Sequence, residues 1–228
     1  MLREMTRPHA TDLVTREDGP AASVIDDYCE VHMTHQNTGP TVLAVSGNPR
    51  PGSRTLTAAE TLARRVAALV GAPDVETIDL ASLAGEILGP EHAAADAARE
   101  RLASATVAVV ATPVYKASYT GLLKAFLDLY GPDGLAGVVV VPLVVSGNPA
   151  HALVGEVHLR PVLVELGAVV PTRSFAVTED RLADLGPVAD AWLAREGDAL
   201  RRAVTPPDPG AGATPDRAVA DAFAGAAR

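Results

Sequence analysis

Hydroxyl, amide and guanidinium side chains gather in one short stretch of the chain, SGNPRPGSRT. Its donors are Ser46, Asn48, Arg50, Ser53, Arg54 and Thr55. A phosphate monoester accepts hydrogen bonds on all of its free oxygens, and cationic donors strengthen those bonds. The stretch therefore predicts an anion site that holds one compact phosphate.

Two well-known phosphate-binding loops do not match this stretch. Gly47 and Gly52 have the G-x-x-x-x-G spacing, but Ser53 and Arg54 occupy the places where a nucleoside-triphosphate loop has Lys and then Ser or Thr. The G-x-G-x-x-G fingerprint of dinucleotide sites does not occur in the loop. The alternative to a phosphate site is an ordinary turn in which Ser53 caps the following helix.

The elements on either side of the stretch are predicted to aim it at one point. Residues 41–45 form a short apolar run, which predicts a buried strand. From Arg54 onward, apolar residues recur at helical spacing, while the Gly and Pro residues between exclude regular structure. In a strand-loop-helix unit, the unpaired N–H groups of the first helical turn point toward the loop. The positive end of the helix dipole lies at the same place, so the arrangement favours an anion there.

The remaining chain predicts an α/β fold. Apolar runs at 75–80, 106–111, 138–145 and 168–177 predict four further strands, and the segments 91–104, 122–130, 152–166 and 187–204 predict helices between and after them. This alternation predicts a three-layer sandwich around a five-stranded parallel sheet. In the strand order 2-1-3-4-5, the loops 46–54, 112–120 and 146–150 converge where ligands bind in such sheets.

The second and third loops carry groups that suit a planar ring. The only two lysines of the chain and three of its four tyrosines lie between Tyr115 and Tyr130. Pro113, Val114, Tyr115 and Lys116 are the predicted ring contacts, together with Ser146, Gly147 and Asn148 from the third loop. The alternative for the tyrosines is that they simply cover apolar surface.

The motifs SGNPRPGSRT and ATPVYKASYTGLLKAFLDLY resemble those of the NAD(P)H-dependent FMN reductases of flavodoxin-like fold, over residues 41–204. The second motif is especially similar to reductases of two-component alkanesulfonate-type monooxygenase systems. The resemblance implies FMN with its phosphate in the 46–55 loop and its ring against Pro113–Lys116 and the third loop. It also implies NADPH or NADH as the hydride donor and a partner monooxygenase. Gly147-Asn148-Pro149 departs from the Gly-Gly that is common in the family.

The cofactors carry the chemistry of such a reaction, so the sequence nominates no catalytic residue. A cation beside the pyrimidine end of the flavin would stabilise its reduced form, and Lys116 is the candidate. His151 is the one histidine near the predicted site, where a capping or core role is the alternative to a ligand contact. Two other functions remain open: an FMN-retaining reductase of quinones, azo dyes or metal oxyanions, and a flavin-binding electron carrier without NAD(P)H turnover.

Composition limits the partners and the compartment. A net charge of −9 argues against nucleic acid and anionic membranes, and a single cysteine together with the polar N-terminal stretch predicts a reducing, cytoplasmic setting. Residues 1–40 and 205–228 are predicted as an N-terminal extension and a tail. Cys29, His32 and His35 supply too few ligands to predict a metal site. Apolar residues along 119–130 predict a homodimer or homotetramer formed through that helix.

Overall fold

A computed structural model describes residues 39–205 of the chain. It contains a parallel sheet of five strands in the order β2-β1-β3-β4-β5, which confirms the predicted flavodoxin-like topology. The strands are β1 (Val42–Ser46), β2 (Val75–Asp79), β3 (Val107–Pro113), β4 (Val139–Ser146) and β5 (Phe175–Thr178). The predicted N-terminal extension, the C-terminal tail and the Cys29, His32 and His35 spacing lie almost entirely outside the described residues.

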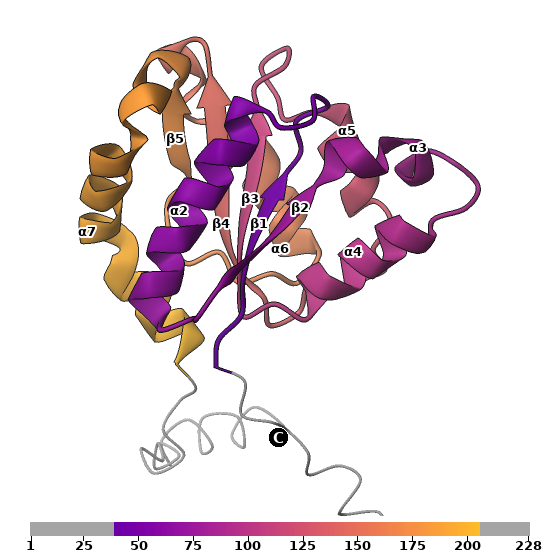
Figure 1. Ribbon diagram of the computed structural model, residues 1–228, viewed down its shortest axis with the longest axis horizontal. Helices are drawn as coiled ribbons and strands as arrows, with labels where there is room; N and C mark the ends of the chain where they lie inside the picture. The colour runs from indigo at the N-terminus through magenta and orange to yellow at the C-terminus, as the bar shows by residue number, and fades with distance from the viewer. Residues whose placement is uncertain (1–38, 206–228) are drawn as a thin grey trace, which may run out of the picture. The chain divides into compact units, whose positions relative to one another are not determined.

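Helices cover both faces of the sheet, as Figure 1 shows. One face is covered by α2 (Arg54–Val70) and α7 (Leu185–Val204), and the other by α3 (Ala84–Ile87), α4 (Ala93–Ala103), α5 (Gly121–Leu127) and α6 (Arg160–Glu165). Short 3-10 helices are η1 (Leu80–Leu83), η2 (Pro149–His151) and η4 (Glu179–Asp184), and a π-helical turn, η3 (Gly155–Leu159), precedes α6.

The central strands are apolar because both of their faces are buried. Every residue of β3 and β4 is buried, and the side chains of Val, Leu and Ala fill two cores, one on each side of the sheet. Such continuous apolar runs, without alternation, are the pattern from which these strands were predicted. The sheet is therefore rigid where its carboxyl ends present the loops.

Two predicted elements differ in the structure. The predicted strand 168–177 is reduced to β5, preceded by a single bridge between Val169 and Val139. The carbonyl oxygens of Val170 and Thr172 accept hydrogen bonds from the Arg160 guanidinium instead of a neighbouring strand. The predicted helix 152–166 begins as a π-helical turn and continues as α6, whose first turn holds Pro161.

Part of the apolar surface predicted on the helix near 119–130 is buried in the protein's own core. Leu123, Phe126 and Leu127 are at most 1% exposed, and Tyr130 donates its hydroxyl to the Arg99 carbonyl oxygen at 3.0 Å. Tyr119 and Leu122, from the same predicted apolar set, are half-buried, so an oligomer through α5 is not tested by this structure. The oligomeric state itself stays a prediction. Among the described residues, no helix has the length and apolar character that a membrane span needs.

Candidate functional site

A cavity of about 540 Å³ lies at the carboxyl ends of β1 and β3, beside the first turn of α2. It is lined by Asn48, Arg50, Pro51, Gly52, Ser53, Arg54, Thr55, Pro113, Tyr115, Val145 and Glu179. Most of the first predicted loop and two residues of the second therefore meet in one place. Its position is the one expected for a ligand site in an open parallel sheet.

The first turn of α2 presents unpaired N–H groups to this cavity. Ser53 is the N-cap, and its Oγ accepts a hydrogen bond from the Leu56 amide at 3.2 Å. The amides of Arg54 and Thr55 have no hydrogen-bond partner within residues 39–205. Ser53 thus has the capping role that was the alternative interpretation of the sequence, and the two free amides are available to an anion.

Several of the predicted phosphate donors hold the loop in shape. The Asn48 side chain donates to Thr55 Oγ1 at 3.1 Å and accepts from the Arg50 amide at 3.0 Å. Ser46 is fully buried, and its Oγ accepts from the Asn48 amide at 3.4 Å. Ser46 does not line the cavity, whereas Arg50 and Arg54 lie at its exposed side. The loop is preorganised by its own side chains before any ligand arrives.

Asp79, at the carboxyl end of β2, is a positioning residue that the sequence analysis missed. Its Oδ2 accepts a hydrogen bond from the Gly52 amide at 3.0 Å, and its Oδ1 accepts from the Ala81 amide at 3.3 Å. Gly52 has a φ of 60°, a conformation that favours glycine. The parallel register places Ser46 opposite Asp79, so the predicted strand order was the signal that could have found this contact.

Two buried threonines join the first loop to the second. Thr120 Oγ1 donates to the Gly47 carbonyl oxygen at 2.5 Å and accepts from the Leu123 amide at 3.2 Å, which caps α5. The Thr120 amide in turn donates to Thr112 Oγ1 at 3.1 Å. Neither threonine lines the cavity, but together they fix the distance between its two walls.

The second loop is a tight hairpin at the edge of the cavity. Tyr115 and Ser118 exchange backbone hydrogen bonds of 2.9 and 3.1 Å, and Lys116 and Ala117 between them have φ values of 53° and 60°. This is the geometry of a type I′ turn. The Tyr115 side chain lines the cavity and is 43% exposed, whereas Lys116 lies at the tip of the turn and does not line it.

The backbone of this hairpin corrects one expectation. Val114, Tyr115 and Lys116 are predicted ring contacts, and a contact through the backbone requires that their amides are free. The Val114 amide donates to the Val145 carbonyl oxygen at 2.8 Å and the Tyr115 amide donates within the turn, so both are already paired. Val114 therefore lies beside the site as part of its frame, and the role of Lys116 near a reduced flavin stays a prediction.

The third loop borders a separate cavity of about 280 Å³, lined by Ser146, Pro149, Thr178 and Arg181 among others. Ser146 Oγ donates to the Asn148 carbonyl oxygen at 2.9 Å, and Asn148 Oδ1 caps η2 by accepting from the Ala150 amide. Gly147, Asn148 and His151 line neither this cavity nor the larger one. The three loops follow neighbouring strands, as predicted, but no residue of 146–150 lines the cavity of about 540 Å³.

The charges around the larger cavity come from distant parts of the chain. Arg54 forms an ion pair of 2.5 Å with Glu179, which follows β5 and begins η4. Their side chains are 67% and 48% exposed, so solvent screens the pair. Arg50 has no ion-pair partner among the described residues. The cavity thus combines two guanidinium groups and two free amides with a single carboxylate.

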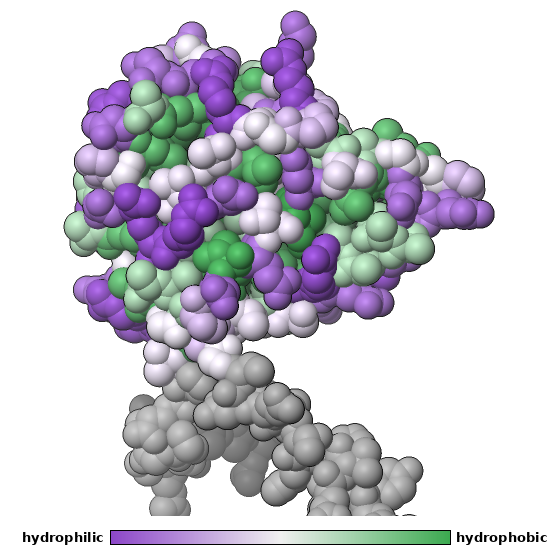
Figure 2. Space-filling view, viewed as in Figure 1, coloured by the Kyte–Doolittle hydropathy of each residue, from purple (hydrophilic) through white to green (hydrophobic). Residues whose placement is uncertain are grey.

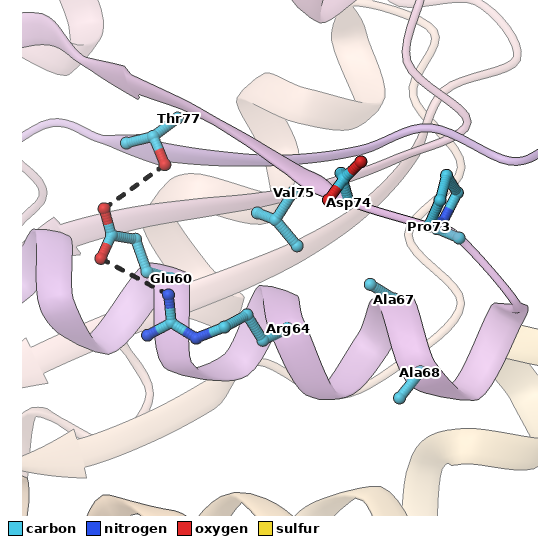
Figure 3. Close-up of a pocket in the computed structure, with 9 residues that line it drawn as sticks. Glu60, Arg64, Ala67, Ala68, Pro73, Asp74, Val75 and Thr77 are labelled. Carbon is cyan, nitrogen blue, oxygen red and sulfur yellow. Dashed lines mark hydrogen bonds and ion pairs between the residues drawn. The ribbon is translucent and has the colours of Figure 1, made fainter.

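Another cavity, of about 440 Å³, lies at the opposite end of α2 and is shown in Figure 3. Glu60 accepts a hydrogen bond from Thr77 at 3.4 Å and lies 3.8 Å from the Arg64 guanidinium. None of the predicted site residues lines this cavity. It adjoins the amino-terminal end of β2, where parallel sheets do not bind ligands, so the site at the carboxyl ends is the functional candidate.

Comparison with known proteins agrees with this geometry. The FMN reductase (NADPH) of Escherichia coli is 49% identical over 69 residues, which cover 30% of this chain and 36% of that protein. The NADH-dependent FMN reductase SfnE of Pseudomonas putida is 31% identical over 72% of this chain and 90% of its own length. The apo structure of an NADH:FMN oxidoreductase, EmoB, is 30% identical, with a TM-score of 0.61 over 79% of this chain and 98% of that one.

The family described as NADPH-dependent FMN reductase matches residues 40–181, from just before β1 to the first turn of η4. The matched range contains the whole cavity lining and every strand of the sheet. On this match, which spans more than half of the chain, the protein belongs to the NADPH-dependent FMN reductase family and is an NAD(P)H:FMN oxidoreductase of flavodoxin-like fold.

Proposed function

We propose that the protein binds FMN with its phosphate at the first turn of α2 and its ring beside Tyr115, and that it releases reduced FMN to a partner monooxygenase. The observation that carries the proposal is the pair of free amides of Arg54 and Thr55 at the cavity wall. A phosphate satisfies both of them and lies at the positive end of the helix dipole. The cavity, at about 540 Å³, is in the size range of small-molecule sites.

Each group of residues has a distinct task in this proposal. Arg50 and Arg54 add positive charge beside the phosphate, and Asn48 and Asp79 keep the loop in its binding conformation. Tyr115 offers an exposed aromatic face at the ring end. When FMN is bound, its ring accepts the hydride of the reduced nicotinamide, and the protein supplies position and exclusion of water rather than an acid or a nucleophile.

Release of the reduced flavin is supported by the resemblance of the second motif to reductases that serve monooxygenases and by the sparse aromatic lining of the site. Tyr115, at the base of the hairpin turn and 43% exposed, is the one aromatic residue among those that line the cavity, so a single aromatic side chain is available to hold the ring. The relatives are named for NADPH in one case and NADH in another, and this chain is proposed to use NADPH or NADH.

The test is a comparison of FMN and riboflavin, which differ only by the phosphate. We expect calorimetric titration to give an FMN dissociation constant at least about ten-fold below that of riboflavin, since hydrogen bonds to a charged group contribute about 1.5–3 kcal/mol. Arg54→Ala should weaken FMN and leave riboflavin unchanged. Equal dissociation constants for the two flavins would refute a phosphate site at α2.

A steady-state assay that varies FMN and NADPH together tests whether the protein releases reduced FMN. Rapid oxidation of NADPH that requires added FMN supports release of the product. Oxidation that requires a quinone while FMN stays bound would instead identify a reductase that retains its flavin, and FMN binding without NADPH or NADH oxidation would identify an electron carrier.

A further inference from the structure

The ion pair between Arg54 and Glu179 lies on the boundary of two cavities. Both residues line the cavity of about 540 Å³, and both also line a second cavity of about 310 Å³. The second cavity lies between α2 and η4, and its other lining residues are Thr57, Ala58, Thr61, Leu182, Ala183 and Leu185. The two cavities therefore share this exposed ion pair in their linings.

The second cavity has the character of a nucleoside site. Leu182, Leu185 and Ala58 supply apolar walls, and the hydroxyl of Thr57 lies on an exposed turn of α2. Figure 2 shows an apolar area at the upper left of the molecule, over the segment that joins β5 to α7. Mostly apolar walls with a few polar groups are typical of sites for flat heterocycles.

From this arrangement we infer that the pair of Arg54 and Glu179 is a partition that limits the flavin site to a monophosphate. This inference rests on the proposed FMN site. FAD carries a second phosphate and an adenosine beyond the phosphate that FMN has. With the first phosphate at the Arg54 and Thr55 amides, this adenylate has to pass the pair, and the Glu179 carboxylate repels its second phosphate. The cavity of about 310 Å³ receives the adenylate once the pair is opened.

The size of the expected effect follows from the exposure of the pair. Both side chains are about half exposed or more, so breaking their contact costs little, and the repulsion between Glu179 and a phosphate is reduced by water. We expect Glu179→Gln to raise the ratio of FAD affinity to FMN affinity about five- to ten-fold, because the release of Arg54 acts on the first phosphate, which both flavins carry, whereas the second phosphate occurs in FAD alone.

The test measures dissociation constants of FMN, FAD and riboflavin by flavin fluorescence quenching. The matched control is Asp180→Asn, which removes the same charge at the next residue, outside both cavities. A second variant, Ala183→Phe in the Glu179→Gln background, fills the cavity between α2 and η4. It should restore the wild-type ratio of FAD to FMN affinity without weakening FMN.

Three outcomes would each overturn the partition. The ratio of FAD affinity to FMN affinity is unchanged in Glu179→Gln, it changes equally in Asp180→Asn, or the gain in FAD affinity persists when Ala183→Phe is added. The wild-type FMN titration reports separately on the proposed function. Loss of FMN binding there would overturn both proposals, whereas tight FMN binding with an unchanged ratio overturns the partition alone.

Discussion

Gly47 lies so close to Leu123 that a side chain at residue 47 has no room. A Cβ atom built on Gly47 would lie 2.7 Å from the Leu123 Cβ, and Leu123 is fully buried in the first turn of α5. The loop after β1 can thus pass beneath α5 only with glycine at this point. This contact sets the distance between the phosphate loop and the helix that follows the hairpin.

We therefore expect Gly47→Ala to destabilise the fold by about 1–3 kcal/mol, the usual cost of overpacking a core. The matched control is Gly147→Ala, where nothing lies within 4 Å of an added Cβ. Urea unfolding of both variants checks the prediction. A Gly47→Ala protein as stable as the control would show that α5 shifts without cost.

Thr120, which is buried, should contribute to stability through the two hydrogen bonds of its hydroxyl. Thr120→Val leaves the Gly47 carbonyl oxygen without its partner and removes the cap of α5, so we expect a loss of about 2 kcal/mol. Thr120→Ser keeps both hydrogen bonds and is the control. Chemical denaturation distinguishes them, and equal unfolding midpoints would contradict the assigned contacts.

Asp79→Ala should weaken FMN binding without unfolding the protein. In this variant the Gly52 amide has no acceptor, so the free loop is less ordered and part of the binding free energy is used to order it. We therefore expect the FMN dissociation constant to rise about three- to ten-fold. Asp74→Ala removes the same charge from the other end of β2. If both variants bind FMN equally well, Asp79 does not position the loop.

Glu156 should make stability depend on pH. Burial raises the pKa of its carboxyl, but hydrogen bonds from Arg160 and Ser174 outweigh this effect and hold the pKa below the ordinary value of 4.5. Because the folded-state pKa is the lower one, the stabilisation is complete above the unfolded pKa and is lost as the pH falls through the folded pKa.

Between neutral pH and pH values below about 4.5, the melting temperature of the wild type should therefore fall more than that of Glu156→Gln. Glu165→Gln in α6 serves as the control, since its carboxylate makes no ion pair among the described residues. Parallel pH profiles of all three proteins would exclude a contribution from Glu156.

The hairpin tip offers a substitution that should stabilise the protein. Ala117 has a φ of 60°, which glycine adopts without steric cost, so we expect Ala117→Gly to raise stability by roughly 0.5–1 kcal/mol. The same change at Ala125, inside α5, should destabilise by about 1 kcal/mol. Thermal unfolding should thus give shifts of opposite sign, and two decreases would show that the turn is not strained.

Local patterns in the sequence were sufficient to predict most of the fold. Continuous apolar runs, helical spacing after Arg54 and the Gly and Pro residues between them predicted the strand, loop and helix of the site. The strand order of the sheet was instead expected from the known order of flavodoxin-like folds. The local patterns depend on neighbours in the chain, such as the cap of Ser53 on α2, and so they can be read without knowledge of the tertiary structure.

Contacts between distant residues were decided only by the tertiary structure. Glu179 reaches Arg54 across 125 residues, and Thr120 reaches Gly47 across 73. Arg160 likewise takes the carbonyl groups that a longer fifth strand would have used. The type of a residue does not determine which distant residue its side chain contacts. The strand, loop and helix around residues 46–55 could therefore be predicted from the sequence, whereas the residues that hold this loop in place depend on how the sheet brings distant segments together.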